Sequence, residues 1–182
     1  MVLYAHGSTT VKGFNIAALT DTTNDAYAES VLVAATFAAQ GYIVVAPNYA
    51  GYDWSELSYH PYYNADQQSK DMIDGLKAAR SALAKLGIVT ADQLFVTGYS
   101  QGGYVAMATQ RALQELKAAN QTTETVTASA PLSGPYAIAA FADAQYYGNV
   151  TVGATINATM MDRIAFWDSR CSPRTSLLSP VA

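Results

Sequence analysis

The pentapeptide Gly98-Tyr99-Ser100-Gln101-Gly102 carries the strongest structural signal in this sequence. It follows the apolar run Leu94-Phe95-Val96-Thr97 and precedes a helical pattern that starts near Gly103. A G-x-S-x-G sequence between a strand and a helix is typical of a sharp turn that exposes a serine hydroxyl. Glycines flank the serine because such a turn leaves no room for side chains. We therefore expect Ser100 to stand above the carboxyl end of a parallel sheet as a nucleophile.

Four apolar runs predict strands, and they are separated by helical patterns. The runs cover residues 2–5, 42–46, 94–97 and 126–131. The β-branched run 42–46 is closed by Pro47 and predicts a parallel strand buried on both faces. Strands that alternate with helices at this spacing indicate βαβ units with right-handed crossovers. The predicted fold class is therefore α/β, with about four parallel strands flanked by helices.

Three helices are predicted between these strands. The first covers residues 25–40 and has Asn24 as its N-terminal cap. The second lies between Asn64 and Gly87, and the third covers 104–119. Apolar residues at helical spacing predict the buried face of the second helix, which consists of Ile73, Leu76, Leu83 and Leu86. The pattern changes beyond Gly134, where residues 135–147 and about 154–168 are further candidate helices.

Length and composition indicate one domain. The chain has 182 residues, of which 51% are hydrophobic and 13% charged, so it can bury a core. We assign residues 1–158 to a partial core. Residues 159–182 form a divergent C-terminal segment without periodicity, and we expect it to be non-native or disordered.

Charge and cysteine content exclude several classes of partner. A net charge of −4 without a basic cluster argues against nucleic acids. The single cysteine, Cys171, excludes an internal disulfide and a cysteine metal site, and we expect neither a metal nor a cofactor. No apolar run is long enough for a transmembrane helix. The start Met1-Val2-Leu3-Tyr4 is typical of a core strand and shows no signal peptide.

A serine nucleophile needs donors that stabilise the oxyanion of the tetrahedral intermediate. The N–H of Gln101 is one candidate, because it lies at the start of a helix, where free amides favour negative charge. The second donor is expected from the loop His6-Gly7-Ser8, which follows the first strand. Our candidates there are the N–H groups of Gly7 and Ser8.

The sequence allows more than one interpretation of the two histidines and of the aromatic residues. Both histidines, His6 and His60, precede Ser100. His6 either shapes the backbone of its loop or acts as base, and His60 is either packed among tyrosines or a substitute base. Aromatic residues either line a substrate pocket or seal the sheet edge. The pocket candidates are Tyr49, Tyr52, Trp54 and Tyr99.

Four stretches together resemble the secretory lipase and cell-wall esterase group of α/β-hydrolases. They are residues 4–7, residues 45–52, Tyr59-His60-Pro61-Tyr62 with its following helix, and residues 98–103 continuing to 132–136. The resemblance implies a central slice of that fold, hydrolysis of small carboxylic esters and a secreted bacterial origin. It also implies a Ser-His-Asp triad, of which only Ser100 can be assigned, because no histidine follows it.

A second hypothesis is a truncated, weakly active or inactive hydrolase that acts as an oligomerising or ester-binding module. About four strands leave open sheet edges and apolar faces. We therefore expect a homodimer or a larger oligomer.

Overall fold

The computed structural model describes residues 1–140 and 142. It divides into two compact units, Met1–Tyr136 and Ala137–Ala182, and the strands and helices named below all belong to the first. The predicted helix over 154–168 and the C-terminal segment 159–182 lie outside the described residues, as do residues 141 and 143–147 of the predicted helix over 135–147, of which residues 138–140 and 142 are helical. No helix among the described residues has the length and apolarity needed to cross a bilayer.

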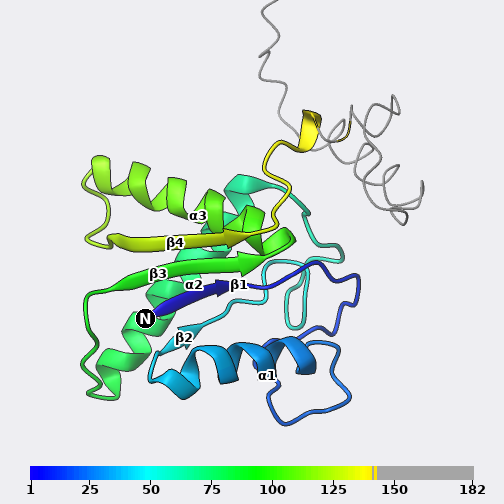
Figure 1. Cartoon of the computed structure of the whole chain (residues 1–182), viewed down its shortest axis with the longest axis horizontal. Helices are drawn as coiled ribbons and strands as arrows, with labels where there is room; N and C mark the ends of the chain where they lie inside the picture. The colour runs from blue at the N-terminus through cyan, green and yellow to red at the C-terminus, as the bar shows by residue number, and fades with distance from the viewer. Residues whose placement is uncertain (141, 143–182) are drawn as a thin grey trace, which may run out of the picture. The chain divides into compact units, whose positions relative to one another are not determined.

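A parallel sheet of four strands forms the centre of the first unit (Figure 1). The strands are β1 (Val2–Ala5), β2 (Val44–Val45), β3 (Leu94–Tyr99) and β4 (Val126–Leu132), in the order β2-β1-β3-β4. All three pairings are parallel. The predicted α/β class and the number of strands are confirmed. Since all four strands run the same way, their carboxyl ends meet at one edge of the sheet.

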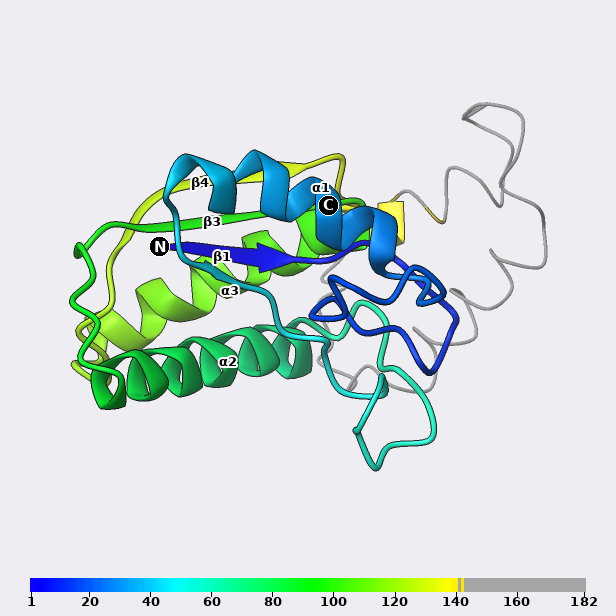
Figure 2. The same cartoon turned by 90° about the horizontal axis from the view of Figure 1, so that it is seen from below.

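Helices cover both faces of the sheet (Figure 2). One face packs against α1 (Tyr27–Thr36), and the opposite face against α2 (Ala65–Lys85) and α3 (Gln101–Ala118). Alternate residues of β1 separate the two cores: Leu3 lies in the core with α2 and α3, whereas Val2 lies in the core with α1. This alternation follows from the two-residue period of a strand.

Three predicted element boundaries are wrong. The strand predicted over 42–46 is reduced to Val44–Val45, and its half-buried residues lie at the edge of the described sheet. The helix predicted over 25–40 ends at Thr36 and is followed by a 3-10 turn. Its N-cap is Ala26 and not Asn24, because the Asn24 side chain accepts from the N–H of Ala26 and holds the turn before the helix.

The other two helices differ from prediction at their ends. Asn64 caps α2 as expected, since its side chain accepts from the N–H of Gln67. Leu86 lies beyond the last turn of α2 and is exposed, so it does not belong to the buried face. The third helix begins at Gln101 and not at 104, because the chain turns within one residue after β3.

Candidate active site

Ser100 lies in a strained turn between β3 and α3. Its φ of 57° and ψ of −122° place it in a backbone region that residues other than glycine rarely adopt. The turn is held on both sides: the N–H of Ser100 donates to the Leu132 oxygen at 3.0 Å, and its carbonyl accepts from Gly103 N–H at 2.9 Å. No described residue hydrogen-bonds the Ser100 hydroxyl. The conformation is therefore fixed by the backbone, and the hydroxyl remains available.

Two glycines permit this turn because backbone atoms approach them closely. A Cβ at Gly102 would lie 1.9 Å from the Ala5 carbonyl oxygen, and one at Gly98 would lie 2.4 Å from the Gly102 oxygen. Both distances are well inside van der Waals contact. The start of α3 is thereby pressed against the end of β1, which brings the loop after β1 beside the turn.

The loop after β1 presents one engaged and one free amide. The N–H of Gly7 donates to the Glu29 carboxylate of α1 at 2.9 Å, and the same oxygen accepts from the Tyr4 hydroxyl at 2.7 Å. Ser8 is exposed, and none of the described residues accepts from its N–H. Gln101 is the first residue of α3, so its N–H has no intrahelical acceptor. Of the predicted donors, Ser8 and Gln101 have no acceptor among the described residues, whereas Gly7 donates to Glu29.

His6 is fully buried directly before this loop. Its ring stacks on Tyr49 with centroids 4.0 Å apart and lies 4.5 Å from the ring of Phe14. Nδ1 lies 2.8 Å from the Gly7 oxygen and Nε2 lies 3.0 Å from the Asn48 oxygen. Burial lowers the pKa of His6, so the ring is neutral and donates from one nitrogen at a time. Both nitrogens face backbone carbonyls, and neither contacts Ser100.

His60 is buried at 6% exposure, and its nitrogens also have partners other than Ser100. Nδ1 lies 2.6 Å from the Ala50 oxygen. Nε2 lies 2.6 Å from the amide nitrogen of the Gln101 side chain and 3.0 Å from that of Gln68. Burial, and to a lesser extent the neighbouring His6, lowers the pKa of His60 to about 4. The structure thus brings His60 to Gln101, the residue after Ser100, and not to Ser100 itself.

The four predicted pocket residues have different environments. Tyr49 and Tyr52 are 5% and 3% exposed and pack against the two histidines. Their hydroxyls donate to the backbone oxygens of His6 and Thr9. Trp54 is 92% exposed on the same loop, and Tyr99, next to Ser100, is 58% exposed. Only Tyr99 is an exposed aromatic residue adjacent in sequence to the serine.

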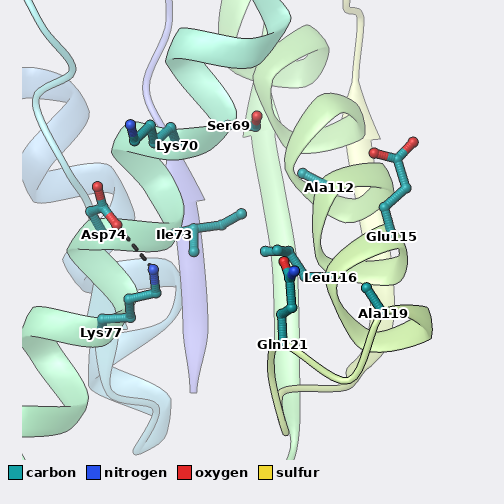
Figure 3. Close-up of a pocket in the computed structure, with 10 residues that line it drawn as sticks. All are labelled: Ser69, Lys70, Ile73, Asp74, Lys77, Ala112, Glu115, Leu116, Ala119 and Gln121. Atoms are coloured by element: carbon teal, nitrogen blue, oxygen red, sulfur yellow. Dashed lines mark hydrogen bonds and ion pairs between the residues drawn. The ribbon is translucent and has the colours of Figure 1, made fainter.

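A groove of about 530 Å³ lies between α2 and α3 (Figure 3). Its walls carry Ile73, Asp74 and Lys77 from α2 and Ala112, Glu115 and Leu116 from α3. Asp74 and Lys77 form an exposed ion pair at 3.2 Å. None of the predicted site residues lines this groove. Among the described residues, no group of three or more histidine, cysteine or acidic side chains is arranged to hold a metal ion.

Three polar residues that organise the site were missed in the sequence. Glu29 binds Gly7 from 22 positions away, and no local pattern indicates this contact. Asp71 accepts from the N–H of Ala50, and Gln68 donates to His60. Gln68 and Asp71 lie one turn apart at the start of α2. Their spacing could have indicated a polar helix face directed at the preceding loop.

The neutral state of buried His60 predicts acid sensitivity. Its pKa is about 4 in the folded protein against an ordinary value of 6.5, so between these values the unfolded chain binds a proton that the folded chain does not. Stability from this residue is complete above pH 6.5 and is lost as pH falls towards 4. The free energy of unfolding of the wild-type chain should therefore fall between pH 7 and pH 4. In His60→Gln, which has no such group, we expect this fall to be smaller by roughly 3 kcal/mol. Urea unfolding at both pH values measures this, and equal losses in the two proteins would contradict it.

The parallel sheet with a strained serine between β3 and α3 defines an α/β-hydrolase. The family comparison agrees with this class. The chain belongs to the prolyl oligopeptidase family, whose model matches residues 28–127. No curated protein sequence matches the chain.

Two proteins of known structure share this fold. The rice cell wall degrading esterase LipA from Xanthomonas oryzae is 34% identical with a TM-score of 0.67, and the match covers 79% of this chain and 35% of that chain. Its ligand-bound form has the same identity and a TM-score of 0.68. A putative hydrolase from Legionella pneumophila, 23% identical with a TM-score of 0.61, is similar in fold over 92% of this chain and 48% of its own. The chain spans about a third of the esterase's length.

Proposed function

We propose that this chain hydrolyses carboxylic esters with Ser100 as the nucleophile. The observation that carries the proposal is the strained turn at Ser100, with a φ of 57°, at the carboxyl end of the sheet. Strain of this kind persists where the surrounding structure holds it, and it gathers at active sites. The similarity to a cell wall degrading esterase favours an ester over a peptide as the substrate.

The proposed reaction follows the acyl-enzyme route. The Ser100 oxygen bonds to the ester carbonyl carbon, the bond from that carbon to the alcohol oxygen breaks, and the hydroxyl proton leaves with the alcohol. Water then releases the acid. Each histidine nitrogen faces another partner, so we assign the base that takes the Ser100 proton to neither His6 nor His60.

We assign the oxyanion hole to the N–H groups of Gln101 and Ser8. Gly7 is excluded as a donor, since its N–H is engaged by the Glu29 carboxylate. His6 supports the choice of Ser8. The Gly7 oxygen, 2.8 Å from His6 Nδ1, belongs to the same peptide as the Ser8 N–H. The two groups of a trans peptide point in opposite directions, so holding the oxygen inward aims the Ser8 N–H outward.

Tyr99 is the proposed contact for the substrate's apolar part. It precedes Ser100 directly and keeps more than half of its surface exposed. Tyr49 and Tyr52 are buried, so we assign them to holding the loop and the histidines in place. Trp54 remains a candidate for a larger substrate, because it extends from the same loop into solvent.

A fluorophosphonate probe tests the proposal together with hydrolysis of p-nitrophenyl acetate and butyrate. The probe reacts covalently with an activated serine, so we expect labelling at one site, mapped to Ser100 by mass spectrometry. A prolyl p-nitroanilide measured in parallel distinguishes peptidase from esterase activity. Failure of the wild-type chain to label or to hydrolyse either ester above background would refute the proposed function.

The open face of β3 and β4 favours a second candidate function, self-association. Leu132 of β4 is 53% exposed beside Tyr99 of β3, its partner in the sheet register. No described residue pairs with the outer edge of β4. We expect a second copy of the chain to pair with the outer edge of β4 and to bury Leu132, while Tyr99 remains open to substrate, because burying exposed apolar surface is favourable. Light scattering after size exclusion should give a dimer or larger species at micromolar concentration, and Leu132→Lys should shift it towards monomer. A wild-type monomer would contradict this expectation.

A further inference from the structure

His60 connects the loop after β2 to the first residue of α3. Its Nδ1 contacts the Ala50 oxygen at 2.6 Å, and its Nε2 contacts the side-chain nitrogen of Gln101 at 2.6 Å. Gln101 directly follows Ser100 and carries a backbone N–H proposed for the oxyanion hole. A single imidazole therefore bridges a loop and the turn that presents the nucleophile, across 41 positions of sequence.

The partners determine the direction of these hydrogen bonds. The Ala50 oxygen only accepts, so Nδ1 carries the hydrogen, and Nε2 of the neutral ring has only a lone pair. Gln101 and Gln68 must both donate to that lone pair. Their side-chain oxygens are buried without a hydrogen-bond partner. The contact with His60 is thus the one that orients both amides, since their oxygens provide no competing bond.

The loop holds His60 rigidly enough to act as such an anchor. Gly51 adopts a φ of 96°, and a Cβ there would lie 2.4 Å from the His60 Cα, so the two backbones touch. Asp71 of α2 accepts from the N–H of Ala50 at 2.8 Å, which fixes the same peptide segment that accepts from His60. The ring of His60 also stacks on Tyr52 with centroids 4.5 Å apart.

We propose that His60 is a positioning residue for ester hydrolysis: through Nε2 it holds the Gln101 side chain and so aims the Gln101 N–H at the developing oxyanion. This inference rests on the proposed function of Ser100. Preorganised donors of this kind act only when their geometry is fixed before the reaction. We assign His60 this positioning role and not that of a base, because its Nε2 lone pair already accepts from the side-chain amides of Gln101 and Gln68.

Two substitutions separate the bonds that His60 makes. In His60→Gln, the side-chain oxygen can take the place of Nε2 and still accept from Gln101, whereas the bond to Ala50 is lost. In His60→Asn, the shorter amide can still donate to Ala50, whereas Gln101 loses its acceptor. The two variants lose similar amounts of ring packing, so each is the matched control of the other.

The first measurements are phosphonylation by the fluorophosphonate probe and hydrolysis of p-nitrophenyl acetate. We expect His60→Asn to lower kcat by about ten- to hundredfold with little change in KM, because a misaimed donor affects the transition state more than substrate binding. His60→Gln should lose at most about threefold. Equal rates in the two folded variants would overturn the proposal, as would a loss confined to KM.

Hydrogen exchange of the Gln101 side-chain amide, which donates to His60 Nε2, is followed by NMR and is independent of activity. We expect protection at Gln101 to be retained in His60→Gln and lost in His60→Asn. Should the wild-type chain fail to label, the proposed function fails, while the exchange measurement still tests whether His60 holds Gln101. Unchanged exchange in His60→Asn would refute the positioning role even if Ser100 proves to be the nucleophile.

Discussion

Ser100→Ala should reduce fluorophosphonate labelling and p-nitrophenyl ester hydrolysis to background, a loss of about 10²-fold or more. The physical reason is that the probe and the ester both need the oxygen that the substitution removes. The fold should persist, because the turn is held by backbone bonds from Ser100 to Leu132 and Gly103 that alanine retains. Circular dichroism and the urea midpoint should therefore match those of the wild-type chain.

Ser133→Ala is the matched control for this experiment. Ser133 also has a positive φ, 50°, and is an exposed serine directly after β4, close in sequence to the Leu132 carbonyl that holds the turn. Labelling and hydrolysis should be unchanged in this variant. Labelling of Ser100→Ala at the wild-type rate would show that another residue reacts with the probe and would refute Ser100 as the nucleophile.

Gly102→Ala should destabilise the chain by about 3 kcal/mol or more, or prevent folding. Its Cβ would lie 1.9 Å from the Ala5 oxygen and 2.7 Å from the His6 oxygen, and both are backbone atoms that cannot rotate away. Relief requires α3 to move off the end of β1. That movement would separate Gln101 from the loop after β1, so activity should fall together with stability.

Gly13→Ala provides the comparison, because no atom lies within 4 Å of the position of its Cβ. Urea unfolding should show a large decrease in the midpoint for Gly102→Ala and a change within about 0.5 kcal/mol for Gly13→Ala. Similar midpoints for the two variants would mean that the tight contact between α3 and β1 does not form.

Much of the fold could be predicted from local patterns. The strands at Val2–Ala5 and 94–97 are short apolar runs closed by turn residues, and the prediction placed them correctly. The strand predicted over 42–46 is longer than the observed one, which covers Val44–Val45. Its β-branched residues satisfy the pattern, but only Val44–Val45 pair with β1, at the edge of the described sheet. Periodicity indicates what a segment favours, whereas pairing depends on its neighbours.

The candidate site was predictable only where it depends on adjacent residues. The position of Ser100 at a strand–helix turn is a local property, and the structure places it there. The choice between Gly7 and Ser8 as donors was not predictable, because it depends on Glu29 in another element. His60 could be predicted only as either a packed histidine or a base, since its contacts with Ala50 and Gln101 arise only after folding.

Local sequence is sufficient to set the order of strands and helices and the turn at Ser100. Glycines at 98 and 102 are required by sterics that act within a few residues and against the adjacent strand. The partners of the two histidines, and the amide that Glu29 engages, are settled by tertiary packing alone. Three of these contacts, from His6 to Asn48, from Gly7 to Glu29 and from His60 to Gln101, join residues 22 to 42 positions apart, which are brought together when the loops meet at the carboxyl edge of the sheet. The turn that presents Ser100 is set by its neighbours in the chain, whereas the contacts around it are set by tertiary packing.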